Sequence, residues 1–282
     1  MSELRSAETW SPAYFARSGD EYLPRTHSHS GWRADQLTGS AVTGLLTHCG
    51  LDVARELDGD RRLVRAAYDL HSVSKLVASR ATARVVKRGR SLTLIDVSIE
   101  QGGRETARAQ LYFVAEAQQS TGKVWAPALP VVPPSPGQTG DRNHRQFFTD
   151  ASGWVAHGSR VDGAARKAVW VGGSPLRPLE LVEGEQVGGA LLAGFAVDSL
   201  NAIASWGLAG IQFINTDATL SLARAPAGDG IGLLATHVST GQGVLSASAA
   251  IFDRIGSLGV ATVTSISRGS TVDPRLWAPV DE

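Results

Sequence analysis

The chain has 282 residues, 43% of them hydrophobic, which is enough for one large domain or two of ordinary size. Its 27 Lys and Arg residues balance 27 Asp and Glu residues, which argues against nucleic acid or a membrane surface as the main partner. The single cysteine, Cys49, excludes an internal disulfide, and the N-terminal segment lacks the apolar stretch of a secretory signal, so we expect a cytoplasmic protein.

The first half of the chain predicts one helix followed by an antiparallel meander. The helix is expected over residues 40–57. Alternating apolar and polar residues, separated by turns that contain glycine, then predict three strands, over residues 76–87, 91–101 and 104–115.

The middle of the chain predicts a linker. Periodicity is lost over residues 117–146, where a cluster of prolines ends at Pro136 and is followed by Gly137 and Gly140. We therefore expect an N-terminal unit over residues 1–116 and a C-terminal unit over residues 147–282.

The second half repeats the plan of the first. Short extended segments are expected within residues 154–171, and a helix over residues 187–206. The most apolar part of that helix, residues 187–197, is too short to span a bilayer. Further strands separated by glycine-rich turns are expected over residues 211–224, 232–239, 244–254 and 259–268.

The two helices match in sequence. Residues 44–46 (Gly-Leu-Leu) and 51–52 (Leu-Asp) have the spacing of residues 190–192 (Ala-Leu-Leu) and 197–198 (Val-Asp), so Asp52 and Asp198 occupy equivalent positions. One helix followed by a meander, twice, predicts an α+β fold with two antiparallel sheets, each wrapped around one central helix.

The second helix is rich in glycine and alanine. Glycine costs up to about 1 kcal/mol in a helix interior, and we expect the close approach of a surrounding sheet to offset that cost. Because the helix is apolar on nearly all sides, it should be buried.

Asp198 interrupts this apolar helix. A buried carboxylate is costly unless it is paired or hydrogen-bonded. One interpretation places Asp198 at a sheet edge or satisfies it through Asn201, which lies on the same stripe as Ser205. The other makes Asp198 a general base or a group that orients water. Asp52 is the weaker candidate because its helix is more polar.

Several segments, taken in order and spacing, resemble one family. Residues 195–201 (FAVDSLN) resemble the second hot dog of thioesterase-like proteins related to acyl-CoA thioesterase II. Further resemblance to these proteins lies at residues 178–185, 213–217, 220–226 and 252–259. In the first half, residues 86–91 and 102–104 are similar to the N-terminal hot dog of the family. The resemblance implies a tandem, or double, hot-dog fold.

The resemblance also implies a catalytic set, which is a helix aspartate, a polar residue on the next strand and a glutamine on the last strand. The first two fall on Asp198 and Asn215. The glutamine falls on Val263 or Thr264, according to a one-residue alignment choice, and neither is glutamine. An alternative site in the first half would use Asp52 and Gln110, which lies at the repeat-equivalent position.

A helix N-terminus offers free N–H donors and a positive dipole end to a developing oxyanion. We therefore expect Gly188 and Gly189, with Asn201, to bind the substrate, and Gly39 and Ser40 offer the same in the first helix. Asp198 would act as a base through a water molecule held by Asn215.

Two functions stay open at this point. The first is an acyl-CoA thioesterase-like enzyme that hydrolyses an acyl thioester with water activated by Asp198. The alternative binds acyl thioesters without efficient hydrolysis, which the missing glutamine favours. The chain has no Gly-x-Ser-x-Gly elbow, and its scattered histidines imply neither a metal nor another cofactor. We expect a homo-oligomer, because each double hot dog would leave one apolar sheet face.

Overall fold

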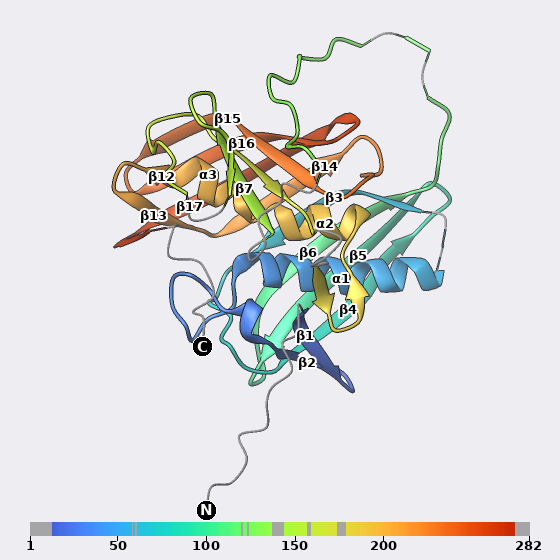
Figure 1. Ribbon diagram of the computed structural model, residues 1–282. Helices are drawn as coiled ribbons and strands as arrows, with labels where there is room; N and C mark the ends of the chain where they lie inside the picture. The colour runs from blue at the N-terminus through green and yellow to red at the C-terminus, as the bar shows by residue number, and fades with distance from the viewer. Residues whose placement is uncertain are drawn as a thin grey trace, which may run out of the picture.

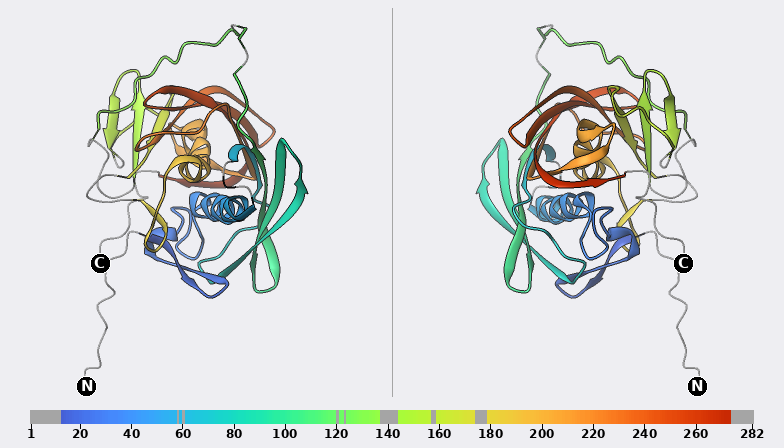
Figure 2. Two further views of the ribbon diagram at one scale, coloured as in Figure 1. Left: turned by 90° about the vertical axis from the view of Figure 1, so that its right-hand side faces the viewer. Right: turned by 90° about the vertical axis from the view of Figure 1, so that its left-hand side faces the viewer.

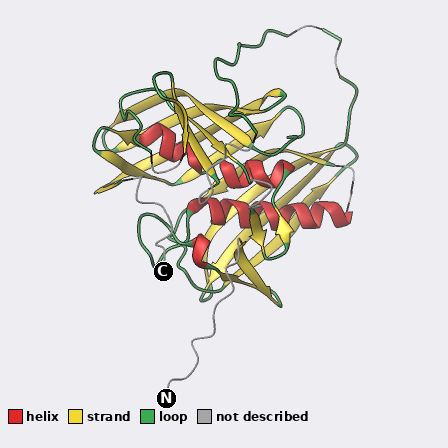
Figure 3. Ribbon diagram, viewed as in Figure 1, coloured by secondary structure: helices red, strands yellow, loops and turns green. Residues whose placement is uncertain are grey.

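Strands make up most of the regular secondary structure, as the colours of Figure 3 show. The structure is a computed structural model that describes residues 13–57, 59, 61–119, 121–122, 124–136, 144–156, 159–173 and 179–273. The N-terminal half contains β1 (Ala13–Ser18), β2 (Glu21–Pro24), the 3-10 helix η1 (Thr26–Ser28), α1 (Gly39–Leu57), β3 (Arg62–Asp69), β4 (Ser79–Arg88), β5 (Leu92–Gln101) and β6 (Arg104–Val114).

The C-terminal half begins with short strands and ends with long ones. It contains β7 (Arg145–Thr149), β8 (Gly153–Ala156), β9 (Ala168–Val171), β10 (Glu180–Val182), β11 (Glu185–Gln186), α2 (Gly189–Ala196), α3 (Ser199–Ser205), β12 (Trp206–Gly207), β13 (Gly210–Asn215), β14 (Asp217–Leu222), β15 (Ile231–Gly241), β16 (Val244–Asp253) and β17 (Gly256–Val272).

The strands join into one sheet. Neighbouring strands run β2, β4, β5, β6, β3, β14, β17, β16, β15, β9, β7 and β8, all antiparallel. The β3–β14 ladder, with Ala67 opposite Thr219, connects the two halves. The two antiparallel sheets predicted for the halves are thus joined through this ladder, and the one departure from antiparallel pairing among the described strands is β1, which pairs in parallel with β10. Pairing β3 with β14 satisfies the edge N–H and C=O groups that two separate sheets would leave open.

Helix α1 lies against the inner face of the first meander. It contacts β4, β5 and β6, and most of its residues are buried. Gly50 sits so close to the sheet that an added Cβ would lie 2.0 Å from Leu111. Figure 2 shows the strands of this half curving past the helix. The predicted helix and meander are confirmed here, each boundary within a few residues.

The single helix predicted over residues 187–206 is two helices in the structure. α2 and α3 are separated by a turn at Val197 and Asp198, where the N–H of Asn201 bonds to the Asp198 carbonyl three residues earlier instead of four. The glycines of α2 also serve a purpose other than the one predicted. A Cβ on Gly194 would lie 2.1 Å from Thr47 Oγ1, so the close neighbour is α1 and not a sheet.

The remaining strand predictions differ in detail. The strand expected over residues 211–224 turns at Thr216 and forms β13 and β14. β1, β2 and β3 had no sequence prediction. Residues 115–119, 121–122 and 124–136 have neither helix nor strand, and β7 begins at Arg145, inside the range predicted for the linker. In the described part of the chain no helix is long and apolar enough to cross a membrane.

Candidate functional site

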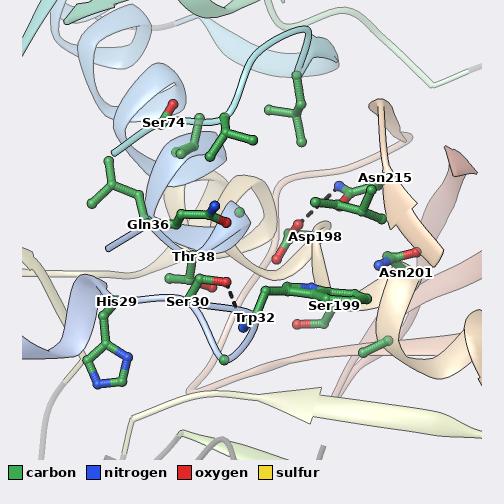
Figure 4. A pocket seen from close by; sticks show the side chains of 18 of the residues that line it. His29, Ser30, Trp32, Gln36, Thr38, Ser74, Asp198, Ser199, Asn201 and Asn215 are labelled. Carbon is green, nitrogen blue, oxygen red and sulfur yellow. Dashed lines mark hydrogen bonds between the residues drawn. The ribbon is translucent and has the colours of Figure 1, made fainter. Parts of the chain in front are cut away.

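A cavity of about 160 Å³ opens where the start of α1 meets the junction of α2 and α3. Figure 1 shows α1 and α2, from opposite halves of the chain, lying side by side. Figure 4 shows the cavity with Asp198 near its centre. Its lining mixes polar and apolar side chains and includes Tyr14, His27, His29, Trp32, Gln36, Val42, Leu70, Val73, Arg145, Asp198, Ser199, Asn201, Ile214 and Asn215.

The Asp198 carboxylate is held from both halves of the chain. Asn215, at the end of β13, donates its Nδ2 to Asp198 Oδ1 over 3.1 Å. Ser40, in the first turn of α1, donates its hydroxyl to Asp198 Oδ2 over 3.1 Å, and its backbone N–H donates to the same carboxylate. The pairing of Asp198 with Asn215, expected from the family resemblance, is therefore present, and Ser40 completes the arrangement.

Gly39 makes this approach possible. A Cβ on Gly39 would lie 2.0 Å from Asp198 Oδ1, so only glycine lets the start of α1 come this close to the carboxylate. The positive end of the α1 dipole then faces Asp198. An ionised carboxylate has about four acceptor positions. The Asn215 amide and the Ser40 hydroxyl each donate to one of its oxygens.

Burial dominates the electrostatics of Asp198. Loss of solvent raises the pKa of its carboxyl group above the ordinary aspartate value, although Arg145 and the hydrogen bonds from Asn215 and Ser40 oppose the rise. A carboxylate with a raised pKa is a stronger base than an exposed one, which suits proton abstraction from water.

Arg145 lies beside this group at the start of β7. Its Nη2 donates to Ser40 Oγ over 2.7 Å, and its Nε donates to Ser199 Oγ over 3.1 Å. The guanidinium carbon lies 5.5 Å from the ring centroid of Phe195. Burial raises the pKa of the Tyr14 hydroxyl, while a hydrogen bond from Arg145 opposes the rise. Sequence reasoning missed Arg145 because it falls within the predicted linker.

Strand β17 carries Val263 and Thr264, the two positions at which the resemblance implies a glutamine. In the β13–β17 register Ser265, and neither Val263 nor Thr264, lies opposite Asn215. Ser265 is buried and donates its hydroxyl to Asn201 Oδ1 over 2.9 Å, and Asn201 donates to the Phe213 carbonyl. Because side chains alternate along a strand, Thr264 lies on the other face of β17, and it does not line the cavity. The Asn201 side chain lines the cavity, but its hydrogen bonds go to Phe213 and Ser265 and not to the Asp198 carboxylate.

The expected oxyanion site at Gly188 and Gly189 is not part of this cavity. These residues start α2, whereas Asp198 follows the end of α2, so about nine residues at 1.5 Å each separate them along the axis. Gly189 has a φ of +53°, which explains its glycine without a ligand. The helix N-terminus that meets Asp198 is that of α1.

The alternative site does not assemble. Asp52 is 36% exposed and pairs with Arg55 over 2.6 Å. Gln110 lies on the outer face of β6, where it donates to Asp96 Oδ1 over 3.2 Å in an open surface groove. Leu111, next to it, faces α1, so the sheet separates Gln110 from Asp52. Within the described residues no group of three His, Cys, Asp or Glu side chains could hold a metal ion.

Comparison of the sequence with protein-family profiles indicates a thioesterase family. The sequence profile of the acyl-CoA thioesterase C-terminal domain family matches residues 123–264. No curated protein sequence matches the chain.

Three solved structures illustrate the likeness of the fold. A protein of Novosphingobium aromaticivorans DSM 12444, provisionally classed as a thioesterase, superposes with a TM-score of 0.64 at 20% identity and covers 90% of this chain and 98% of its own. Acyl-CoA thioesterase II of Mycobacterium marinum has a TM-score of 0.59 at 16% identity, with 89% and 94% covered. A protein of Alicyclobacillus acidocaldarius with a hot-dog fold has a TM-score of 0.62 at 12% identity, with 91% and 96% covered. The fold of this chain is thus that of hot-dog proteins.

Proposed function

Because the chain belongs to the acyl-CoA thioesterase C-terminal domain family, we propose that it hydrolyses an acyl thioester such as an acyl-CoA at the Asp198 cavity. The observation that carries the proposal is the Asp198 carboxylate, which is held by Asn215 and Ser40 and lines the cavity. The attacking water would bind to this carboxylate, which can accept about four hydrogen bonds.

The reaction needs no covalent intermediate on the protein. Asp198 takes a proton from water as the water oxygen bonds to the thioester carbonyl carbon. The resulting oxyanion would be stabilised by the first-turn N–H of Gly39, a group without an intrahelical partner, and by the α1 dipole. The carbon–sulfur bond then breaks, and protonated Asp198 returns its proton to the departing thiolate.

The second candidate is an acyl-thioester-binding protein without efficient hydrolysis. It is favoured by the missing glutamine, which the family resemblance implies at Val263 or Thr264, and by the absence of Thr264 from the cavity lining. The Ser265 hydroxyl already donates to Asn201. A site of this kind binds the thioester but lacks one group for holding water.

We also propose a double hot dog, with one hot dog in residues 1–116, a linker over residues 117–146 and a second in residues 147–282. The helix-then-meander order, present in both halves, supports this division. Both hot dogs would contribute helices to the shared site: α1 comes from the first, and α2 and α3 come from the second.

The test is release of free thiol from acyl-CoAs that range from acetyl to palmitoyl and include aryl species. Asp198→Asn keeps the shape but removes the basicity, so hydrolysis should fall by about 10²-fold or more. Asp52→Asn is the matched control, since Asp52 is the equivalent helix aspartate outside the cavity, and it should leave the rate unchanged.

Other outcomes separate the alternatives. If Asp52→Asn abolishes hydrolysis and Asp198→Asn does not, the working site lies in the first half. If the wild type binds acyl-CoA by calorimetry yet releases no thiol from any species, the binding protein is the correct description.

A further inference from the structure

We infer that Arg145 is a positioning residue of this site, which directs the Ser40 hydroxyl onto Asp198 and supplies the fixed positive charge that keeps the base ionised. The inference rests on the proposed function and adds a residue to it. It starts from the contacts that Arg145 makes with both halves of the chain.

The direction of the hydrogen bonds follows from the donor inventory. Arginine can only donate, so Ser40 Oγ must accept from Arg145 Nη2, at 2.7 Å. The one hydroxyl proton of Ser40 is then free to point at Asp198 Oδ2, 3.1 Å away. Hydrogen bonds arranged in such a chain strengthen one another. Without Arg145 the Ser40 hydroxyl could rotate and leave Asp198 with one donor fewer.

The guanidinium group is itself fixed on several sides. Its Nε bonds to Ser199 Oγ at 3.1 Å, its plane lies over the Phe195 ring at 5.5 Å, and the Tyr14 hydroxyl accepts from it. Ser199 directly follows Asp198, so the same arginine holds the backbone turn that carries the base. A lysine could supply the charge but not this planar fork.

Arg145 is also the permanent cation of the cavity. The titratable or charged groups that line it with Asp198 are Arg145 from β7, Tyr14 from β1, and His27 and His29 from the segment before α1. Burial raises the pKa of Asp198, and the Arg145 charge lowers it. Removal of the charge should therefore raise the pKa of Asp198 further, and the base would be protonated over a wider pH range.

The experiment compares Arg145→Gln, Arg145→Lys and the wild type in two readouts. The first is the pH dependence of kcat/KM for thioester hydrolysis, whose acidic limb reports the base of the free enzyme. The second is the titration of the Asp198 carboxyl carbon by ¹³C NMR, assigned with Asp198→Asn. Arg61→Gln is the matched control, because Arg61 also donates to a hydroxyl, that of Thr93, but lies outside the cavity.

We expect Arg145→Gln to move both the acidic limb and the Asp198 titration to higher pH and to lower kcat by about 10-fold or more. Arg145→Lys should keep the titration of Asp198 near that of the wild type, because the positive charge remains. It should still lower kcat, because lysine lacks the planar guanidinium group that bonds to Ser40 and Ser199 together. Arg61→Gln should change neither. The combined Ser40→Ala and Arg145→Gln variant should lose less than the product of the single losses, since the arginine acts through the serine.

Two results would overturn the inference. One is an Asp198 titration that is the same in Arg145→Gln and in the wild type. The other is full multiplicativity of the Ser40 and Arg145 effects. A wild type that hydrolyses nothing contradicts the proposed function instead, and the NMR titration still decides whether Arg145 controls the charge of Asp198.

Discussion

Asp52 and Asp198 show how surroundings decide the role of a residue. Both follow the same spacing in their helices, and sequence treats them as equivalent. Asp52 faces solvent and binds the exposed Arg55. Asp198 is enclosed by Ser40, Asn215 and Arg145, which come from three other elements. Burial in the second arrangement raises the pKa of the Asp198 carboxyl group at a cavity that a substrate can enter.

The raised pKa of Asp198 has a consequence for stability. The folded state holds the carboxyl proton more tightly than the unfolded chain does, so ionisation at neutral pH destabilises the fold. This cost is absent below the ordinary aspartate pKa of about 4 and grows as pH rises above it. Asp198→Asn removes the charge and should therefore stabilise the protein at pH 7, on the order of 1 kcal/mol.

Urea unfolding at pH 7 and near pH 4 measures this difference. The gain of Asp198→Asn over the wild type should shrink at the lower pH. Asp52→Asn, which breaks an exposed ion pair, should change stability by less than about 1 kcal/mol. An Asp198→Asn variant less stable than the wild type at pH 7 would show that the lost hydrogen bonds outweigh the buried charge.

At the scale of elements, the two helix starts have different roles. The N-terminus of α1 meets Asp198 with a glycine at the contact, whereas the N-terminus of α2 has open space around Gly188. The sequence has glycine at both helix starts but does not show which start meets Asp198. The contact that distinguishes the two starts joins Ser40 and Asp198, which lie 158 positions apart. The crossing of Gly194 with Thr47 is another such long-range contact.

Gly39→Ala and Gly188→Ala form a matched pair that tests this assignment. An alanine Cβ at position 39 would lie 2.0 Å from Asp198 Oδ1, so the carboxylate must move, and kcat/KM should fall by about 10²-fold. Alanine at position 188 meets no atom within 4 Å and should leave the rate within about twofold of the wild type. Circular dichroism checks that both variants fold. Loss of activity in Gly188→Ala alone would place the oxyanion at α2.

At the scale of the whole molecule, sequence reasoning reached local structure more readily than the assembly of the site. The alternation of apolar and polar residues and the turn glycines predicted the β4–β6 meander. The repeat identified Asp52 and Asp198 as equivalent candidate residues. The break at Val197 was not predicted, because the segment has no proline and because Asp198, the N-cap residue of α3, was interpreted as part of one continuous helix. Arg145 and Ser265 have no local signal, since their importance comes from residues brought close only by the fold.

The outer surface of the sheet bears on the predicted homo-oligomer. In the N-terminal half this face is polar, with ion pairs from Arg84 to Asp96 and from Arg108 to Asp69. In the C-terminal half, exposed apolar residues occur on β16 and β17, including Val244 and its register partner Ile266. We therefore place the predicted interface on the C-terminal half.

We expect self-association through this C-terminal face, because burying exposed apolar area is the usual driving force for pairing. Light scattering at micromolar concentration should give a multiple of the 29.7 kDa chain mass. Val260→Lys places a charge on β17 at a residue that is 56% exposed, and it should shift the mass towards the monomer. Val86→Lys is the control, since Val86 is 42% exposed on β4 of the other half and should leave the mass unchanged. A monomer mass for the wild type would contradict the prediction, and a shift with Val86→Lys alone would move the interface to the N-terminal half.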